Sequence, residues 1–426
     1  MDQVFSSLKP VFDYLLSIGN IVLLPIIIFA LATLWFKQPP KEAFRSALMI
    51  GIGYVGISMV TGFLTANLGP AVQAMVTRFG LHFTVIDVGT AGSKFVAFGT
   101  PVGLLYIPIV ILVNLLLITL KVTKTIDIDI WNYWHFAFWG GIVYGLTNNL
   151  LYGALAVAIG TVIILVFADL TQPVVEKFYK LPNISIPHGT SLSFGILALP
   201  FVKIIEAIPG LRDIDVTPES IQKRFGTFGE PAFMGLIMGT GLGALGGLSL
   251  PNVLQLGMKM AGVFFLISRV VGYLVEGLMP IAEAAKKVFA ERYKGRKIFI
   301  GLDSALLIGN PAVMATALLM MPISILLAVI LPGNRFLPFS DLVLFPFVFA
   351  MIVPLCKGNI VRSVLVGSCV MVIGLYVATY VTDAFTAAGL IGGLKVLEPG
   401  QTASSVVDGA TWIGGALKFL FGLLPH

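Results

Sequence analysis

The stretch that decides the fold runs from residue 298 to residue 311 and reads IFIGLDSALLIGNP. It holds a single carboxylate, Asp303, among apolar residues, and Asn310-Pro311 interrupts the run seven residues later. An ionisable side chain is costly inside a bilayer, so an acid in such a setting indicates a functional site. Glycine and proline would break a helix here and free backbone groups to line a cavity. The alternative is that Asp303 caps a helix outside the membrane, because helix N-termini favour Asp.

The composition predicts an all-α polytopic membrane protein. Hydrophobic residues make up 57% of the 426 residues and charged residues only 11%, with a mean hydropathy of +0.97. Soluble domains carry about 25% charged residues. The net charge of +6 is spread over loops, so it speaks to orientation in a membrane and not to nucleic acid. Cys356 and Cys369 form no metal or redox motif, and no cleavable signal peptide is expected before the first long apolar run.

Apolar windows long enough to span a bilayer, or to form the core of a span, predict about eleven transmembrane helices. The windows fall in two series, at 21–36, 46–64, 99–118, 131–144 and 150–167, and at 233–248, 253–274, 312–331, 342–355, 361–380 and 412–424.

Positive charge in the loops predicts the orientation. Nineteen lysines and arginines fall in one set of alternating loops and five in the other. Because cytoplasmic loops are enriched in these residues, we expect the N-terminus outside and the C-terminus in the cytoplasm.

The two series of windows resemble copies of each other. Residues 57–64 (ISMVTGFL) align with residues 267–274 (ISRVVGYL), Asp129 with Asp341, and Asn149 with Asn359, at offsets between 210 and 214. Each copy holds five spans, an odd number, so the second copy runs with opposite orientation. Inverted repeats with broken helices are an architecture of transporters. Asp87-Val88-Gly89 corresponds to the Asp303 stretch with a few residues of slack, which favours a cavity site over a helix cap at Asp303.

This pattern divides the chain into four parts. Residues 1–170 form the first repeat, 171–230 a cytoplasmic-side linker, 231–385 the second repeat, and 386–426 a terminal loop and the eleventh span. Within the linker, the apolar run 192–202 lies between Pro187 and Pro200 and is too short to span, so a re-entrant hairpin segment is expected near 187–202.

Two histidines are candidate site residues. His188 precedes the re-entrant run with Gly189 and Thr190, and its ring offers a donor and an acceptor; the alternative is a turn histidine beside the basic linker. His135 lies near the start of a span among polar and aromatic neighbours. It could line a cavity or sit in an interfacial aromatic belt.

Glu230 opens the second repeat beside proline, where it could bind solute or only offset the positive end of a helix dipole. The sequence contains no phosphate-binding Gly-Lys-Ser/Thr loop, no metal-ligand spacing and no Gly-x-Ser-x-Gly elbow. We therefore expect no metal, no cofactor and no ATP-hydrolysing domain on this chain.

Six motifs, in order and spacing, resemble a known family over nearly the whole chain. They read DVG at 87–89, DIWN followed by WH at 129–135, IPHGTS at 186–191, FG followed by FGEP at 225–231, GLD at 301–303 and PGN at 332–334. They resemble the galactitol-specific membrane component, IIC, of the bacterial phosphotransferase system, a family related to the ascorbate IIC transporters.

The resemblance implies a homodimer in the bacterial inner membrane, each protomer having a scaffold and a mobile core that carries solute by an elevator-like displacement. It implies phosphorylation of the imported sugar alcohol from a cysteine phosphate on a IIB partner, which is supplied through IIA. We expect IIB on a separate chain, because no IIB-like domain follows residues 412–426.

A linear hexitol has six hydroxyls and no charge, so carboxylates and imidazoles suit it as hydrogen-bond partners. The predicted substrate-binding residues are Asp87, Val88, Gly89, His135, His188, Gly189, Thr190, Glu230, Asp303 and Asn310. An ion-coupled secondary transporter is the alternative; Asp87, Asp303 and Glu230 would then bind a proton or sodium. A channel is a weaker third interpretation.

Overall fold

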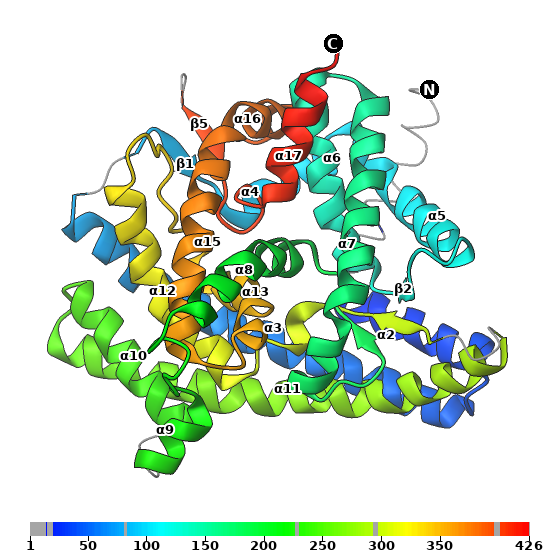
Figure 1. Cartoon of the computed structure of the whole chain (residues 1–426), viewed down its shortest axis with the longest axis horizontal. Helices are drawn as coiled ribbons and strands as arrows, with labels where there is room; N and C mark the ends of the chain where they lie inside the picture. Colours follow the sequence, from blue (N-terminus) through cyan, green and yellow to red (C-terminus); the bar gives the residue numbers. More distant parts are fainter. Residues whose placement is uncertain are drawn as a thin grey trace.

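The computed structural model describes Tyr14 and residues 20–80, 83–225, 230–292, 297–395 and 401–425, and it is built mainly of helices (Figure 1). The first half of the chain holds α2 (Asn20–Ala30), α3 (Pro40–Arg78), β1 (Val85–Asp87), α4 (Gly89–Gly99), α5 (Tyr106–Thr119), β2 (Thr125–Asp127), α6 (Trp134–Thr147), α7 (Leu150–Tyr179), β3 (Ile184–Ser185), α8 (Gly189–Ala207) and α9 (Pro218–Phe225). The second half holds α10 (Pro231–Leu245), α11 (Leu250–Arg292), β4 (Phe299–Gly301), α12 (Pro311–Ile330), α13 (Phe345–Phe349), α14 (Ile352–Leu355), α15 (Ile360–Tyr380), α16 (Thr382–Ile391), β5 (Thr402–Ser404) and α17 (Trp412–Gly422).

Among the described residues, six helices are long and apolar enough to cross a membrane, by length and composition: α3, α7, α8, the segment Leu250–Ile281 of α11, α12 and α15. Four more apolar helices are shorter, at Pro25–Trp35, α5, α10 and α17. These helices confirm the predicted class, an all-α multi-pass membrane protein. The count of eleven spans stays a prediction.

Two predicted segments differ from the structure. The window 342–355 is not one helix but a 3₁₀ turn, Leu342–Leu344, followed by α13 and α14, because Pro346 and Pro354 lack the N–H groups that a continuous helix needs. The run 192–202 was predicted to be too short to span, and this was wrong: α8 continues through Pro200 to Ala207 and has 19 residues. The re-entrant path of this segment stays a prediction.

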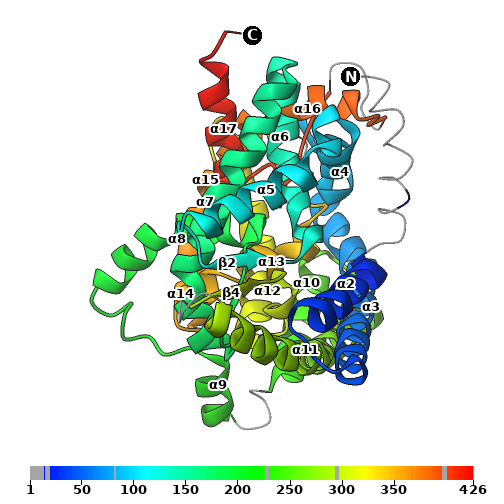
Figure 2. The same cartoon turned by 90° about the vertical axis from the view of Figure 1, so that its right-hand side faces the viewer.

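The helices form two layers. The long helices α3 and α11 pack against each other, with α10 against α11 and α2 against α3, and this layer runs across the lower part of Figure 1. Helices α4 to α7 and α15 to α17 stand above it, and Figure 2 shows the same division from the side. Helices α8, α12 and α13 and the strands β2 and β4 lie between the two (Figure 2), whereas β1 and β5 lie beside α16 in the upper layer (Figure 1).

Five short strands join segments that are far apart in the sequence. β1 pairs in parallel with β5, and Val85 also bridges Phe336. β4 lies between β2 and β3, parallel to both, with Gly301 level with Asp127 and with Ser185. Because the carboxyl ends of parallel strands meet at one edge, the residues that follow β2, β3 and β4 converge.

Buried side chains hold β2 in place. Asn114 of α5 donates to the Thr125 carbonyl at 2.8 Å and accepts from the Asp127 N–H at 3.0 Å, which is the bonding of a neighbouring strand. Asp169 of α7 accepts from the Lys124 N–H at 2.7 Å and from the Thr125 hydroxyl at 2.8 Å. The edge of the three-stranded sheet is therefore paired, as buried backbone groups require.

Glycines allow the close contact between α3 and α11. A Cβ on Gly277 of α11 would lie 2.7 Å from the Ser46 carbonyl oxygen and 2.9 Å from the Ile50 nitrogen of α3. A Cβ on Gly53 of α3 would lie 2.7 Å from the Leu274 Cβ. Small residues at a helix contact let backbones approach closely inside a membrane.

We predict that Gly277→Ala lowers the thermal midpoint of unfolding, because the added methyl group meets backbone atoms that cannot rotate away. Overpacking of this kind costs about 1–3 kcal/mol. The matched control is Gly272→Ala on the same helix, where nothing lies within 4 Å of the new Cβ. The control should match the wild type or exceed it, since Ala favours a helix over Gly by about 1 kcal/mol. Equal midpoints for the two variants, measured by scanning fluorimetry in detergent, would contradict the contact.

Candidate functional site

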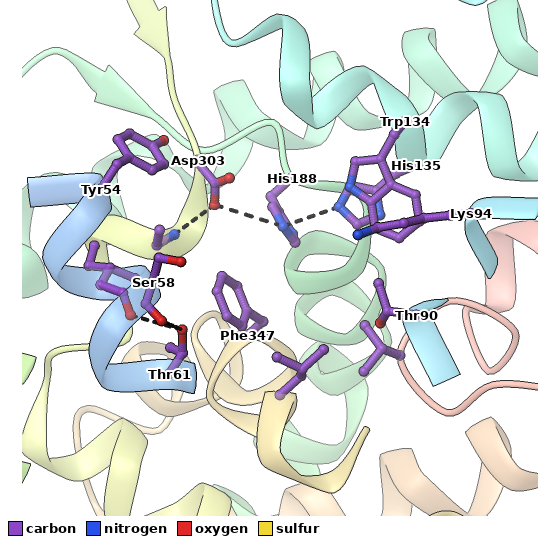
Figure 3. Close-up of a pocket in the computed structure, with 14 residues that line it drawn as sticks. Tyr54, Ser58, Thr61, Thr90, Lys94, Trp134, His135, His188, Asp303 and Phe347 are labelled. Atoms are coloured by element: carbon purple, nitrogen blue, oxygen red, sulfur yellow. Dashed lines mark hydrogen bonds and ion pairs between the residues drawn. The ribbon is translucent and has the colours of Figure 1, made fainter. Parts of the chain in front are cut away.

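A cavity of about 350 Å³ opens between α3 and the ends of the short strands (Figure 3). One wall is α3, with Tyr54, Ile57, Ser58 and Thr61. The remaining lining comes from the upper layer and the segments between the layers: Thr90, Lys94, Trp134, His135, His188, Asp303, Ala305, Leu344, Phe347 and Val407. The volume lies at the small end of the range for ligand pockets, about 300–1,000 Å³, so the cavity suits a small solute.

His188 forms the N-terminal cap of α8. Its Nδ1 accepts a hydrogen bond from the Ser191 N–H at 3.2 Å. The Ser191 hydroxyl lies 3.2 Å from the same nitrogen and also 2.6 Å from the Phe347 carbonyl, where it donates its hydrogen. Nδ1 therefore acts as an acceptor, and in the neutral ring the hydrogen sits on Nε2.

His135, in the first turn of α6, continues the chain of contacts. Its Nε2 lies 3.2 Å from the Nε2 of His188, and both rings are buried. Because His188 Nε2 carries the hydrogen, His135 Nε2 accepts, and the hydrogen of a neutral His135 lies on Nδ1. Gly189 makes this contact possible, since a Cβ there would collide with the Cβ of His135.

Asp303 follows β4 and meets the histidines. Its Oδ1 accepts from the Ala305 N–H at 2.7 Å and lies 3.9 Å from His188 Nε2 (Figure 3). The two interpretations of this acid are therefore compatible: Asp303 caps the 3₁₀ turn Ser304–Leu306 and also lines the cavity. The carboxylate and the imidazole therefore lie side by side at one end of the cavity.

Asp87, Val88 and Gly89 do not line this cavity. The Asp87 carboxylate accepts from three backbone N–H groups, those of Gly89 at 3.0 Å, Phe339 at 2.8 Å and Ser340 at 2.9 Å. Gly89 has a φ of +59°, a conformation that glycine adopts without strain. In this structure these residues tie β1 to the segment before η6 (Leu342–Leu344). Their role in substrate binding stays a prediction.

The other predicted site residues also fall into two groups, those beside the cavity and those away from it. Thr190 is buried with its hydroxyl 3.5 Å from His135 Nδ1, next to the cavity. Asn310 caps α12 by accepting from the Ala312 N–H at 2.9 Å, and Glu230 is exposed at the start of α10. The structure thus brings together His135, His188, Gly189, Thr190 and Asp303, and it places Glu230 and Asn310 outside the lining.

The sequence analysis missed several lining residues. Lys94 could have been found from the sequence, because an ionisable residue in an apolar segment indicates a functional site. Tyr54, Ser58 and Thr61 could not, since their place depends on how α3 is rotated against the upper layer. Among the described residues, no group of three or more His, Cys, Asp and Glu side chains is arranged to hold a metal ion.

The cavity can bind a polar, uncharged solute. Hydroxyl, imidazole, carboxylate and ammonium groups alternate as donors and acceptors around it, and the rings of Trp134 and Phe347 offer apolar surface. Together with the six long apolar helices, this defines the class of protein: a multi-pass membrane protein with a solute-sized polar cavity.

Comparison with known proteins identifies the family. The model of the family described as "PTS system sugar-specific permease component", where PTS stands for phosphotransferase system, matches residues 14–399. The galactitol-specific EIIC component of the PTS from Escherichia coli K12 is 37% identical over 406 residues, covering 95% of this chain and 89% of that protein. A putative permease IIC component from the same organism is 36% identical over 384 residues, covering 90% and 88%. The chain belongs to the family of sugar-specific permease components of the phosphotransferase system.

We predict that Asp87→Asn lowers the thermal midpoint of the protein more than it weakens solute binding, because the carboxylate holds three backbone groups. Hydrogen bonds to a charged group contribute about 1.5–3 kcal/mol each. The measurement pairs scanning fluorimetry with calorimetric titration of the purified variant. A large loss of affinity at an unchanged midpoint would instead support direct contact between Asp87 and solute.

Proposed function

We propose that this chain is the IIC permease for galactitol or a similar hexitol, and that it presents the imported solute to a phosphorylated IIB partner. The observation that carries the proposal is the 37% identity to a galactitol-specific EIIC component over 95% of the chain, joined to a cavity lined by hydrogen-bonding groups. IIB is a separate chain in this proposal and receives its phosphoryl group through IIA.

The cavity supports recognition of a polyol. A solute hydroxyl donates to the Asp303 carboxylate and lies beside the His188 ring, whose Nε2 is 3.9 Å from Asp303 Oδ1. Lys94 and the hydroxyls of Ser58, Thr61 and Thr90 line the same cavity and bond the other hydroxyls of the hexitol in this proposal. Charge-assisted bonds of this kind are about twice as strong as neutral ones, and their directions select stereochemistry.

The direction of the hydrogen bonds bears on phosphorylation. His188 donates from Nε2 to His135, because its other nitrogen is occupied by the Ser191 N–H. In this arrangement the Asp303 carboxylate is the group placed to accept the proton that the acceptor hydroxyl gives up. The basic segment 286–297 and the residues Lys223 and Arg224 are the proposed docking surface for IIB, by charge complementarity with an acidic face. Residues 293–296 of that segment lie outside the described part of the chain.

We also propose an elevator-like displacement of a mobile core against a scaffold. The layer of α2, α3, α10 and α11 is the scaffold in this view, and the upper layer with the intervening segments is the core. The division of the cavity wall supports it: Tyr54, Ile57, Ser58 and Thr61 belong to α3, whereas Asp303 and both histidines belong to the core. Exposed apolar residues on α3 and α11, such as Phe44, Met59 and Phe265, are available to lipid and to a second protomer of the proposed homodimer.

Strand pairing supports the proposed inverted repeats. β1 and β4 are separated by 214 positions, and Thr125 and Phe336 by 211, within the offsets of the sequence alignment. β1 pairs with a second-half segment at Phe336, and β4 pairs with β2 of the first half. Asn149 and Asn359 cap α7 and α15 at corresponding positions. Each half therefore supplies one strand, β1 or β4, that pairs with a segment of the opposite half.

The proposed orientation has the N-terminus outside and the C-terminus in the cytoplasm, and it rests on the distribution of basic residues among the loops. Two of the basic segments predicted to be cytoplasmic form ion pairs, Arg45 with Glu276 at 2.9 Å and Lys297 with Glu176 at 3.5 Å. Labelling of a single cysteine at Lys287 tests the orientation. A cysteine there that reacts only with an impermeant reagent from outside would overturn it.

The transport reaction is tested in vesicles that contain the purified chain and labelled galactitol. We expect galactitol phosphate to accumulate on the cytoplasmic side only when the phosphorylated IIB partner is supplied there. Accumulation of unmodified galactitol driven by a proton or sodium gradient would contradict this and indicate an ion-coupled transporter. Uptake that does not distinguish between hexitols would indicate a channel.

We predict that Asp303→Asn weakens galactitol binding by roughly ten- to a hundredfold, the loss of about 1.5–3 kcal/mol from one charge-assisted bond. His188→Gln, whose amide can still donate, should retain more affinity than His188→Leu, which cannot. Asp383→Asn is the control, because Asp383 lies on α16 outside the cavity lining. Calorimetric titration of the four purified variants makes the comparison. Wild-type affinity in both Asp303→Asn and His188→Leu would place the site elsewhere.

A further inference from the structure

The residue that the proposed function leaves unexplained is Asp408, in the loop between β5 and α17. It is 1% exposed, and within the described part of the chain neither of its carboxylate oxygens has a hydrogen-bond partner. A buried acceptor without a partner is costly, so a carboxylate in such a place needs an explanation. The neighbouring residue, Val407, lines the cavity.

One polar group beside the Asp408 side chain is His135. The distance from Asp408 Oδ1 to His135 Nδ1 is 3.4 Å, and both side chains are buried. The hydrogen bond from His188 already requires that a neutral His135 carry its hydrogen on Nδ1. The carboxylate of Asp408 therefore lies beside the nitrogen that carries this hydrogen.

The backbone of the loop is fixed to the same helix that carries His135. The Thr411 hydroxyl donates to the Asp408 carbonyl at 2.7 Å and accepts from the indole N–H of Trp139 at 2.9 Å. Trp139 lies four residues after His135, one turn further along the same face of α6. Two contacts on one helix face thus set the distance between the carboxylate and the imidazole.

Four side chains then form a continuous series across the cavity edge. Asp408 Oδ1 is 3.4 Å from His135 Nδ1, the two Nε2 atoms are 3.2 Å apart, and His188 Nε2 is 3.9 Å from Asp303 Oδ1. The series connects the loop after β5 with the turn after β4, which belong to different sheets. The two acids are the ends of this series. Between them, the hydrogen bond of the two histidines runs from His188 Nε2 to His135 Nε2.

We propose that Asp408 is a positioning residue for the solute site: it holds His135 in the tautomer with hydrogen on Nδ1, so that His135 Nε2 accepts from His188. This hydrogen bond fixes the orientation of the His188 ring at the edge of the cavity, beside Asp303. Asp408 itself does not line the cavity. The identity of the solute in this proposal rests on the proposed function. The tautomer of His135 rests on the contacts alone.

Other groups also lie near Asp408. Ser93 and Lys94 of α4 face its carboxylate, and the Ser93 hydroxyl is also bonded to the hydroxyl of Ser405 at 2.9 Å and to the Gly89 carbonyl at 3.2 Å. The Thr90 hydroxyl donates to the Asp341 carboxylate at 3.0 Å. The Thr190 hydroxyl is hydrogen-bonded to His135 Nδ1 at 3.5 Å, so Thr190 and Asp408 lie on the same side of the ring.

The first test reads the tautomer and needs no solute. The full chain in lipid nanodiscs is labelled with ¹⁵N-histidine, and the His135 signals are assigned by their loss in His135→Gln. We expect Nδ1 of His135 to be protonated at neutral pH in the wild type, and this preference to be lost in Asp408→Leu, which has no acceptor. A wild-type His135 protonated on Nε2 overturns the proposal, and so does a tautomer that is unchanged in Asp408→Leu.

The second test is a double-mutant cycle on galactitol affinity. Asp408→Leu and His135→Gln should each weaken binding by about tenfold, the range for one buried hydrogen bond. The double variant should be no weaker than the weaker single variant, because both changes break the same series. Effects that multiply would show that Asp408 acts through the general stability of α17. Asp383→Asn, which removes the ion pair to Lys418 of α17, controls for that stability and should bind as the wild type does.

The two tests separate the two proposals. A wild-type protein that does not bind galactitol contradicts the proposed function, and the histidine spectra still decide the role of Asp408. A wild-type protein that binds galactitol, with an unchanged tautomer in Asp408→Leu, keeps the proposed function and removes Asp408 from it.

Discussion

The structure depends on one constraint: a helix interrupted in an apolar environment leaves backbone N–H and C=O groups that need partners. Within the described residues, parallel strands of two or three residues meet this need by pairing each break with a break elsewhere in the chain. The side chain of Asn114 completes the pairing at the edge of β2, and Asp87, at the end of β1, accepts from one N–H group after β1 and from two in the segment before η6. The polar site follows from this arrangement, because the parallel strands end together and release His188 and Asp303 at one place.

The same constraint explains which parts of the site the sequence could predict. An acid or a histidine in an apolar stretch is visible without a structure, and Asp303, His135 and His188 were found in that way. Asp87 has the same signal in the sequence, yet in the structure its carboxylate is occupied by backbone donors. In the sequence, a carboxylate that bonds the free backbone groups at a helix break looks the same as a carboxylate that faces a cavity. Only the partners that distant segments supply distinguish the two cases.

The class of fold was predictable for a different reason. Hydropathy alone identifies long apolar helices, and six of them are present. Their ends were less predictable: Pro200 lies inside α8, whereas Pro346 and Pro354 accompany real breaks. A proline removes one hydrogen bond, and tertiary packing decides whether the helix continues past it. The lining of the cavity by α3 was not predictable, because rotation of a helix that is apolar on most faces leaves little trace in its sequence.

The division of the cavity wall has a mechanical consequence. Tyr54, Ile57, Ser58 and Thr61 lie on one long helix, whereas the series from Asp408 to Asp303 lies entirely on the other side. A displacement between the two sides would change the contacts that α3 makes and leave the histidine series intact. In the proposed elevator-like displacement, solute bound at Asp303 would keep its charge-assisted hydrogen bond during the movement, and the hydroxyls of α3 would contribute only in some positions. A ligand shifts an equilibrium only by its difference in affinity between two states, so the proposal assigns any influence of solute on the movement to the side chains of α3.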